Sequence, residues 1–100
     1  MNIVVITPSK NKLNKFDATI NGAKTISFGA RGMSDFTIHK YRERRGRYNL
    51  RHQKNERWDD PTTSGFYSRW LLWNLPSLQD SLKDMNKRFE SKGFHFFLRL

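Results

Sequence analysis

Residues 65–74 read Gly65-Phe66-Tyr67-Ser68-Arg69-Trp70-Leu71-Leu72-Trp73-Asn74 and hold two of the three tryptophans in the chain. At about 100° per residue, large side chains of this stretch fall on one continuous arc of a helix: Phe66, Tyr67, Trp70, Leu71 and Trp73. Burial of one such side chain contributes roughly 1.5–3 kcal/mol. We therefore predict that this helix forms the centre of the core. Leu72 points the other way, and we expect it to face a second surface that binds a partner.

The ends of this helix and the start of another can be predicted from capping residues. Thr62, Thr63 and Ser64 offer hydroxyl caps for the first helix, and Pro76 prevents its continuation. Ser77 is a cap for a second helix, whose apolar residues recur at helical spacing: Leu78, Leu82, Met85 and Phe89. Residues 64–90 are thus predicted to form two helices joined by a tight corner.

The amino-terminal part of the chain has the periodicity of strands. Residues 2–6 form a β-branched run, and residues 15–20 and 23–28 alternate on either side of Asn21-Gly22, the usual chemistry of a hairpin turn. Residues 94–100 form a last apolar strand, with Phe97 on the face opposite its main apolar row. This strand is expected either to complete the amino-terminal sheet or to dock on another protein.

Together these patterns predict one α+β domain over residues 1–100. Strands and a hairpin occupy residues 1–28, a basic helical stretch 34–58, the aromatic and amphipathic helices 64–90, and the terminal strand 94–100. The expected architecture is a small antiparallel sheet packed on three to four short helices. The chain has no cysteine and no apolar run long enough to span a bilayer, which favours a soluble intracellular protein.

Charge is concentrated in one segment of the chain. The formal net charge is +10, and residues 39–58 carry eight basic and two acidic residues. A helix here would place Tyr41, Tyr48 and His52 on one stripe, with an interruption at Gly46. We predict that the basic residues of this stretch bind either an acidic protein surface or nucleic-acid phosphates. These residues are Arg42, Arg44, Arg47, Arg51, Lys54 and Arg57.

Catalytic patterns are scarce, so we predict no enzyme, cofactor or metal. The histidines have no recognised metal spacing. Asp59-Asp60 could hold Mg²⁺ in a nuclease, or could serve only as a polar helix break. The segment Gly29-Ala30-Arg31-Gly32 ahead of Ser34 could form a phosphate-binding concavity, or could simply let the chain turn.

Three blocks, residues 27–40, 47–52 and 64–78, resemble a family of small basic proteins of large double-stranded DNA viruses of algae and protists, the nucleocytoplasmic large DNA viruses. The resemblance extends from about Phe16 to Phe89. It departs from the family pattern at Tyr41-Arg42, where the family tends to have Asp-Pro. The family offers no catalytic residues to transfer, and the resemblance implies a viral setting.

In that setting we expect a non-enzymatic virion structural protein, made in the host cytoplasm and located in the capsid. It would be a minor capsid or capsid-associated adaptor that binds the major capsid protein and other minor components through Leu72, Phe97 and the basic stretch. The alternative is a genome-associated nucleic-acid-binding protein that uses residues 39–58.

Overall fold

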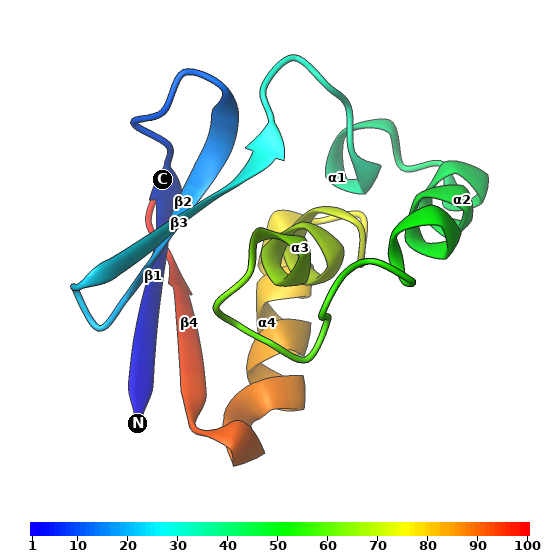
Figure 1. Ribbon diagram of the computed structural model, residues 1–100. Helices are drawn as coiled ribbons and strands as arrows, with labels where there is room; N and C mark the ends of the chain where they lie inside the picture. The colour runs from blue at the N-terminus through cyan, green and yellow to red at the C-terminus, as the bar shows by residue number, and fades with distance from the viewer.

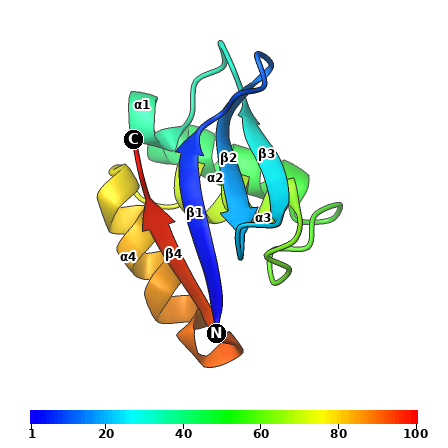
Figure 2. The same ribbon diagram turned by 90° about the vertical axis from the view of Figure 1, so that its left-hand side faces the viewer.

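The computed structural model describes residues 1–100 and consists of a four-stranded sheet with all of its helices on one face (Figure 1). The strand order is β3-β2-β1-β4. Figure 2 looks onto the opposite face of the sheet, where no helix lies in front of the strands. The α+β class predicted from the sequence is confirmed. None of the helices has both the length and the apolar composition needed to span a bilayer.

The first three strands form an antiparallel meander. They are β1 (Asn2–Pro8), β2 (Asn14–Ile20) and β3 (Lys24–Ala30). The turn between β2 and β3 has positive φ at Asn21 (52°) and Gly22 (68°), as the Asn-Gly pair predicts.

The fourth strand, β4 (Phe94–Leu98), pairs in parallel with β1. The choice left open by the sequence is therefore settled, because this strand completes the sheet. Val4 lies opposite Phe96 in the register, and both side chains are buried beneath the helices. Ile3 and Phe97 lie on the uncovered face, where they are 40% and 46% exposed.

The basic stretch is broken in a different place from the one predicted. Helix α1 (Phe36–His39) ends where Lys40 adopts the left-handed conformation (φ 61°), and α2 (Arg42–His52) then runs without interruption through Gly46. Tyr41 is the N-cap residue of α2 and therefore precedes its first turn. Its side chain is 62% exposed and does not pack beside Tyr48 against the body of the protein.

The aromatic segment contains a change of helix type. Helix α3 (Ser64–Tyr67) is capped by the Thr63 hydroxyl and passes directly into the π-helix η1 (Ser68–Leu72). A π-turn holds more residues per turn than an α-turn, so side-chain directions drift away from the α-helical wheel. The prediction that Leu72 faces outward is wrong, because only 2% of Leu72 is exposed and its Cδ1 packs against Gly29.

The second half of the helical layer follows the sequence pattern. Ser77 caps α4 (Leu78–Phe89), and a short 3₁₀ turn, η2 (Glu90–Lys92), leads to Gly93 in the left-handed conformation (φ 81°).

The core lies between the sheet and α3, η1 and α4. The predicted core side chains that are buried there are Phe66, Tyr67, Leu71, Trp73, Met85 and Phe89. Trp70, Leu78 and Leu82 pack at its margin. The sheet contributes Val4, Ile6, Ala18, Ile26, Phe28 and Phe96, and α1 contributes Phe36.

Candidate anion-binding cleft

A cleft of about 460 Å³ separates α2 from the far end of the β2–β3 hairpin. One wall is formed by α2 and contributes Arg44, Arg47, Arg51 and His52. The opposite wall consists of Lys15, Gly29, Ala30 and residues 33–35, while Tyr48, Ser68, Leu72 and Trp73 line the base. Three helix arginines and a lysine thus meet at one opening.

The arginines on the α2 wall have no partner within the protein. Arg44, Arg47 and Arg51 follow one another at spacings of three and four residues, which places them on one side of the helix. All three are exposed, and none of the ion pairs in the structure involves them. The wall therefore presents uncompensated positive charge to the cleft.

The lysine and the acid across the cleft, by contrast, neutralise each other. Lys15 Nζ lies 2.6 Å from Asp35 Oδ2, and both side chains are largely buried. The other oxygen of Asp35 accepts hydrogen bonds from the backbone N–H and the hydroxyl of Thr37, which caps α1. Lys15 therefore adds little free charge to the cleft.

This arrangement excludes the phosphate concavity considered for the glycine-rich segment. The Asp35 carboxylate occupies the start of α1, the place that a bound phosphate would take. Arg31 instead donates hydrogen bonds to the carbonyls of Ser9, Asn11 and Asn14, so it closes the loop before β2. Gly29 and Gly32, both at positive φ, let the chain turn.

Stacked rings form the base of the cleft. Tyr48 lies between Trp73, at 4.0 Å between ring centroids, and His52, at 4.1 Å. Both faces of the phenol ring are thus covered by the protein's own side chains. Burial, the largest cause, raises the pKa of Tyr48, which keeps its hydroxyl neutral near pH 7.

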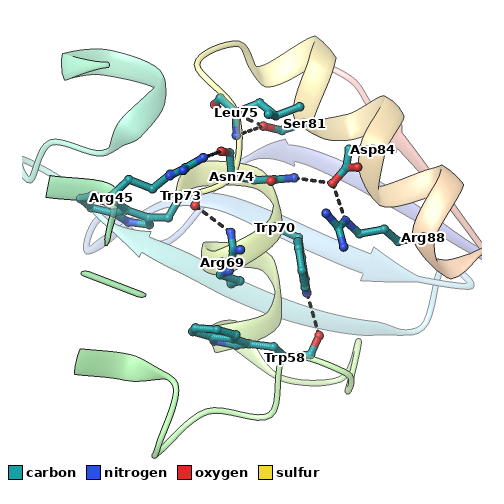
Figure 3. A network of polar contacts seen from close by, with 10 residues as sticks. All are labelled: Arg45, Trp58, Arg69, Trp70, Trp73, Asn74, Leu75, Ser81, Asp84 and Arg88. Atoms are coloured by element: carbon teal, nitrogen blue, oxygen red, sulfur yellow. Dashed lines mark hydrogen bonds and ion pairs between the residues drawn. The ribbon is translucent and has the colours of Figure 1, made fainter. Parts of the chain in front are cut away.

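A network of polar contacts fixes α2 to the corner after η1 (Figure 3). The backbone carbonyls at this corner point to cationic side chains: Arg45 Nη1 donates to the carbonyl of Asn74 at 3.0 Å, and Arg69 Nη1 to that of Trp73 at 2.8 Å. Asn49 also donates to Trp73. Arg45 therefore holds the helix in place, and its three neighbouring arginines remain free.

The same network continues into α4. Asp84 accepts from Asn74 at 2.7 Å and from Arg88 at 2.6 Å. Burial on its own would raise the pKa of Asp84, but these hydrogen bonds outweigh it and the pKa is lowered. Burial, with Arg45 and Arg88 nearby, lowers the pKa of Arg69 to about 10, so Arg69 stays charged at neutral pH.

The predicted partner-binding residues do not form one site. Arg44, Arg47 and Arg51 line the cleft, whereas Arg42, Lys54 and Arg57 are exposed outside it. Arg57 lies 3.7 Å from Asp59 in an exposed pair. Leu72 is buried below the cleft, and Phe97 lies on the uncovered face of the sheet.

Asp59 and Asp60 lie in the loop before α3. Asp60 accepts from the backbone N–H and the hydroxyl of Thr62, and these hydrogen bonds lower its pKa. No group of three or more histidines and acidic residues is placed to hold a metal ion. The local contacts of Asp60 are those of a turn.

The cleft residues that sequence reasoning missed come from distant parts of the chain. Lys15 lies on a strand and Ser68 on η1, and no pattern links either residue to α2. Only the fold brings them together.

Comparison with curated proteins and with solved structures found no match. Residues 4–52 are similar to a protein family of unknown function (DUF5754). That segment runs from β1 to the end of α2, and the match indicates neither a virus nor an activity. It contains every residue that lines the cleft except Ser68, Leu72 and Trp73.

Proposed function

We propose that this protein is a non-enzymatic nucleic-acid-binding protein that contacts the phosphate backbone through Arg44, Arg47 and Arg51. The observation that supports this proposal is the set of three exposed guanidinium groups on one cleft wall with no acidic partner. Guanidinium groups bind phosphate oxygens in a bidentate manner, and nucleic-acid affinity depends mainly on such contacts.

The base of the cleft favours phosphate over base recognition. The rings of Tyr48 and Trp73 stack on each other at an interplanar angle of 4°, and His52 covers the other side of Tyr48. A base entering the cleft would have to break this stack. We therefore expect the cleft itself to bind nucleic acid with little sequence preference.

Replacement of Arg44, Arg47 and Arg51 by glutamine is expected to weaken nucleic-acid binding strongly and to flatten its salt dependence. Each phosphate contact on duplex DNA contributes a slope of about −0.9 in a plot of log affinity against log salt. The triple variant should therefore lose up to about 2.7 from the slope. Fluorescence anisotropy titrations at several salt concentrations measure both effects.

A matched control removes the same charge elsewhere. Lys24, Lys83 and Lys87 are exposed, lie outside the cleft and have no ion pair. Their replacement by glutamine should lower the affinity much less than the arginine variant does. Equal losses in the two triple variants, or a wild-type affinity that does not change with salt, would contradict the proposed function.

The second candidate is a virion structural protein, a minor capsid or capsid-associated component that binds the major capsid protein and other minor capsid components. The observation in its favour is the uncovered face of the sheet, where Ile3 and Phe97 are each at least two-fifths exposed. Apolar side chains gathered on an exposed face are typical of protein contacts. If the protein is such a virion component, it would be made in the host cytoplasm and located in the capsid.

Replacement of Phe97 by lysine is expected to leave the fold intact and to remove the protein from virus particles, if this face binds capsid proteins. Quantitative mass spectrometry of purified particles, separated into shell and genome-core fractions, measures the incorporation. Unchanged amounts of the variant in the shell would count against this surface. Recovery of the wild-type protein with the core would favour the nucleic-acid function.

A further inference from the structure

A second cavity continues the basic cleft toward the start of α2. It has a volume of about 430 Å³ and is lined by Lys40, Tyr41, Arg42, Glu43, Arg44 and Arg47. Arg44 and Arg47 line both cavities, so these two side chains form the boundary between them. A nucleic-acid backbone whose phosphates contact Arg51, Arg47 and Arg44 in turn would therefore reach the second cavity.

Tyr41 is the aromatic residue of this second cavity, and its ring has an open face. The ring stacks on His39 at 5.5 Å between centroids and an interplanar angle of 13°, yet the residue is 62% exposed. No second aromatic ring and no cationic side chain packs on Tyr41. One face of the phenol ring therefore points to solvent beside the arginines.

His39 holds the ring of Tyr41 in place on the face that it covers. The backbone N–H of Tyr41 donates to His39 Nδ1 at 2.8 Å, and the imidazole in turn packs against Trp73 and Phe36. Burial, with Arg44 nearby, lowers the pKa of His39, so this supporting ring is neutral at pH 7. Tyr41 is thus preorganised and would need little rearrangement to receive a planar ligand.

We infer that the partner is single-stranded nucleic acid, with phosphates on Arg44 and Arg47 and one unpaired base stacked on the open face of Tyr41. This inference rests on the proposed function and names its ligand more closely. A duplex hides the faces of its bases between neighbouring pairs, whereas a single strand can present a base to an aromatic ring. Tyr48 and Trp73 do not offer such a face, because they already cover each other.

Replacement of Tyr41 by alanine is expected to weaken binding of single-stranded DNA about 5- to 150-fold, the range for loss of one base stack, and to leave duplex binding unchanged. Anisotropy titrations would use a fluorescent 12-nucleotide thymidine strand, a duplex of the same length and an abasic strand with the same phosphates. The alanine variant should bind the abasic strand as the wild type does, because that strand has no base to stack.

Two further variants separate stacking from a structural role. Tyr41→Phe keeps the ring and should retain wild-type affinity for the thymidine strand. Leu50→Ala removes an exposed apolar side chain elsewhere on α2 and should also have no effect. Equal weakening of single-stranded, duplex and abasic binding in Tyr41→Ala, or no weakening at all, would overturn the assignment of Tyr41 but leave the phosphate-binding function. Failure of the wild-type protein to bind any of the three probes would overturn both.

Discussion

Replacement of Leu72 by aspartate is expected to destabilise the protein severely. Leu72 is 2% exposed, lies against Gly29 of β3 and belongs to the same buried cluster as Tyr67 and Leu71. Aspartate would lose these contacts and place an unpaired carboxylate in the core, at an expected cost of about 4 kcal/mol or more. Domains of this size have about 5–15 kcal/mol of stability in total. Circular dichroism during thermal and urea denaturation measures the loss.

The control at this position is Leu72→Met, which nearly conserves side-chain volume. It should cost less than about 1.5 kcal/mol and preserve the transition. If the aspartate variant melted at the wild-type temperature, Leu72 would have to lie at the surface, as the α-helical wheel predicts. The burial found here would then be wrong.

Replacement of Asn86 by alanine is expected to destabilise the outer edge of the sheet. The Asn86 side chain accepts from the backbone N–H of Phe96 at 2.7 Å and donates to its carbonyl at 2.9 Å. Phe96 is 1% exposed, so both of its backbone groups would lose their partner where water has poor access. An unsatisfied buried group costs about 1–3 kcal/mol, so we expect a loss of about 2–4 kcal/mol and a melting temperature lower by about 10 °C or more.

Asn86→Asp tests the donor and acceptor separately. Its carboxylate can still accept from the N–H of Phe96 but faces the carbonyl without a proton to donate, so this variant should also be destabilised at pH 7. Lowering the pH protonates the carboxyl and restores the donor, which should reduce the difference in stability from the wild type.

The control is Gln79→Ala, a substitution at an exposed residue of the same helix, which should have little effect on stability. Native-state hydrogen exchange of the Phe96 amide reports the opening directly, and unchanged protection in Asn86→Ala would contradict the role of this side chain.

The parts of the fold that could be predicted are those in which local chemistry and periodicity agree. Asn21-Gly22 requires positive φ in a hairpin turn, and both φ values are positive. Ser77 caps α4 through a hydrogen bond from the backbone N–H of Asp80, and Gly93 closes the turn that follows the helix. In each of these places neighbouring residues alone determine the backbone.

The parts that could not be predicted depend on tertiary contacts. The π-turn of η1 brings Leu72 inward, and its energetic reason is the packing of Leu72 on β3, which no local pattern records. Likewise, α2 tolerates Gly46 because Arg45 and Asn49 attach the helix to the corner carbonyls. The chain breaks instead at Lys40, whose ammonium donates to the carbonyls of Thr37 and Pro76.

The cleft was only partly foreseeable for the same reason. Charge clustering identified the arginines of α2, but it did not separate the three that line the cleft from the basic residues outside it, which are Arg42, Lys54 and Arg57. Position opposite the hairpin makes that distinction, and it is a property of the folded chain. Tyr41 was expected on one stripe with Tyr48 because the predicted helix included it, whereas α2 begins at Arg42.

The parallel pairing of β1 with β4 has a consequence for how the protein forms during synthesis. The second edge of β1 can be filled only after residues 94–98 have been synthesised, because Val4 lies opposite Phe96. The meander can assemble early, because its pairings are local in sequence, but the sheet can close only after β4 has left the ribosome. Contacts between such distant segments slow folding. Until then, the exposed edge of β1 is a place where a nascent chain would be vulnerable to mispairing and would benefit from a chaperone.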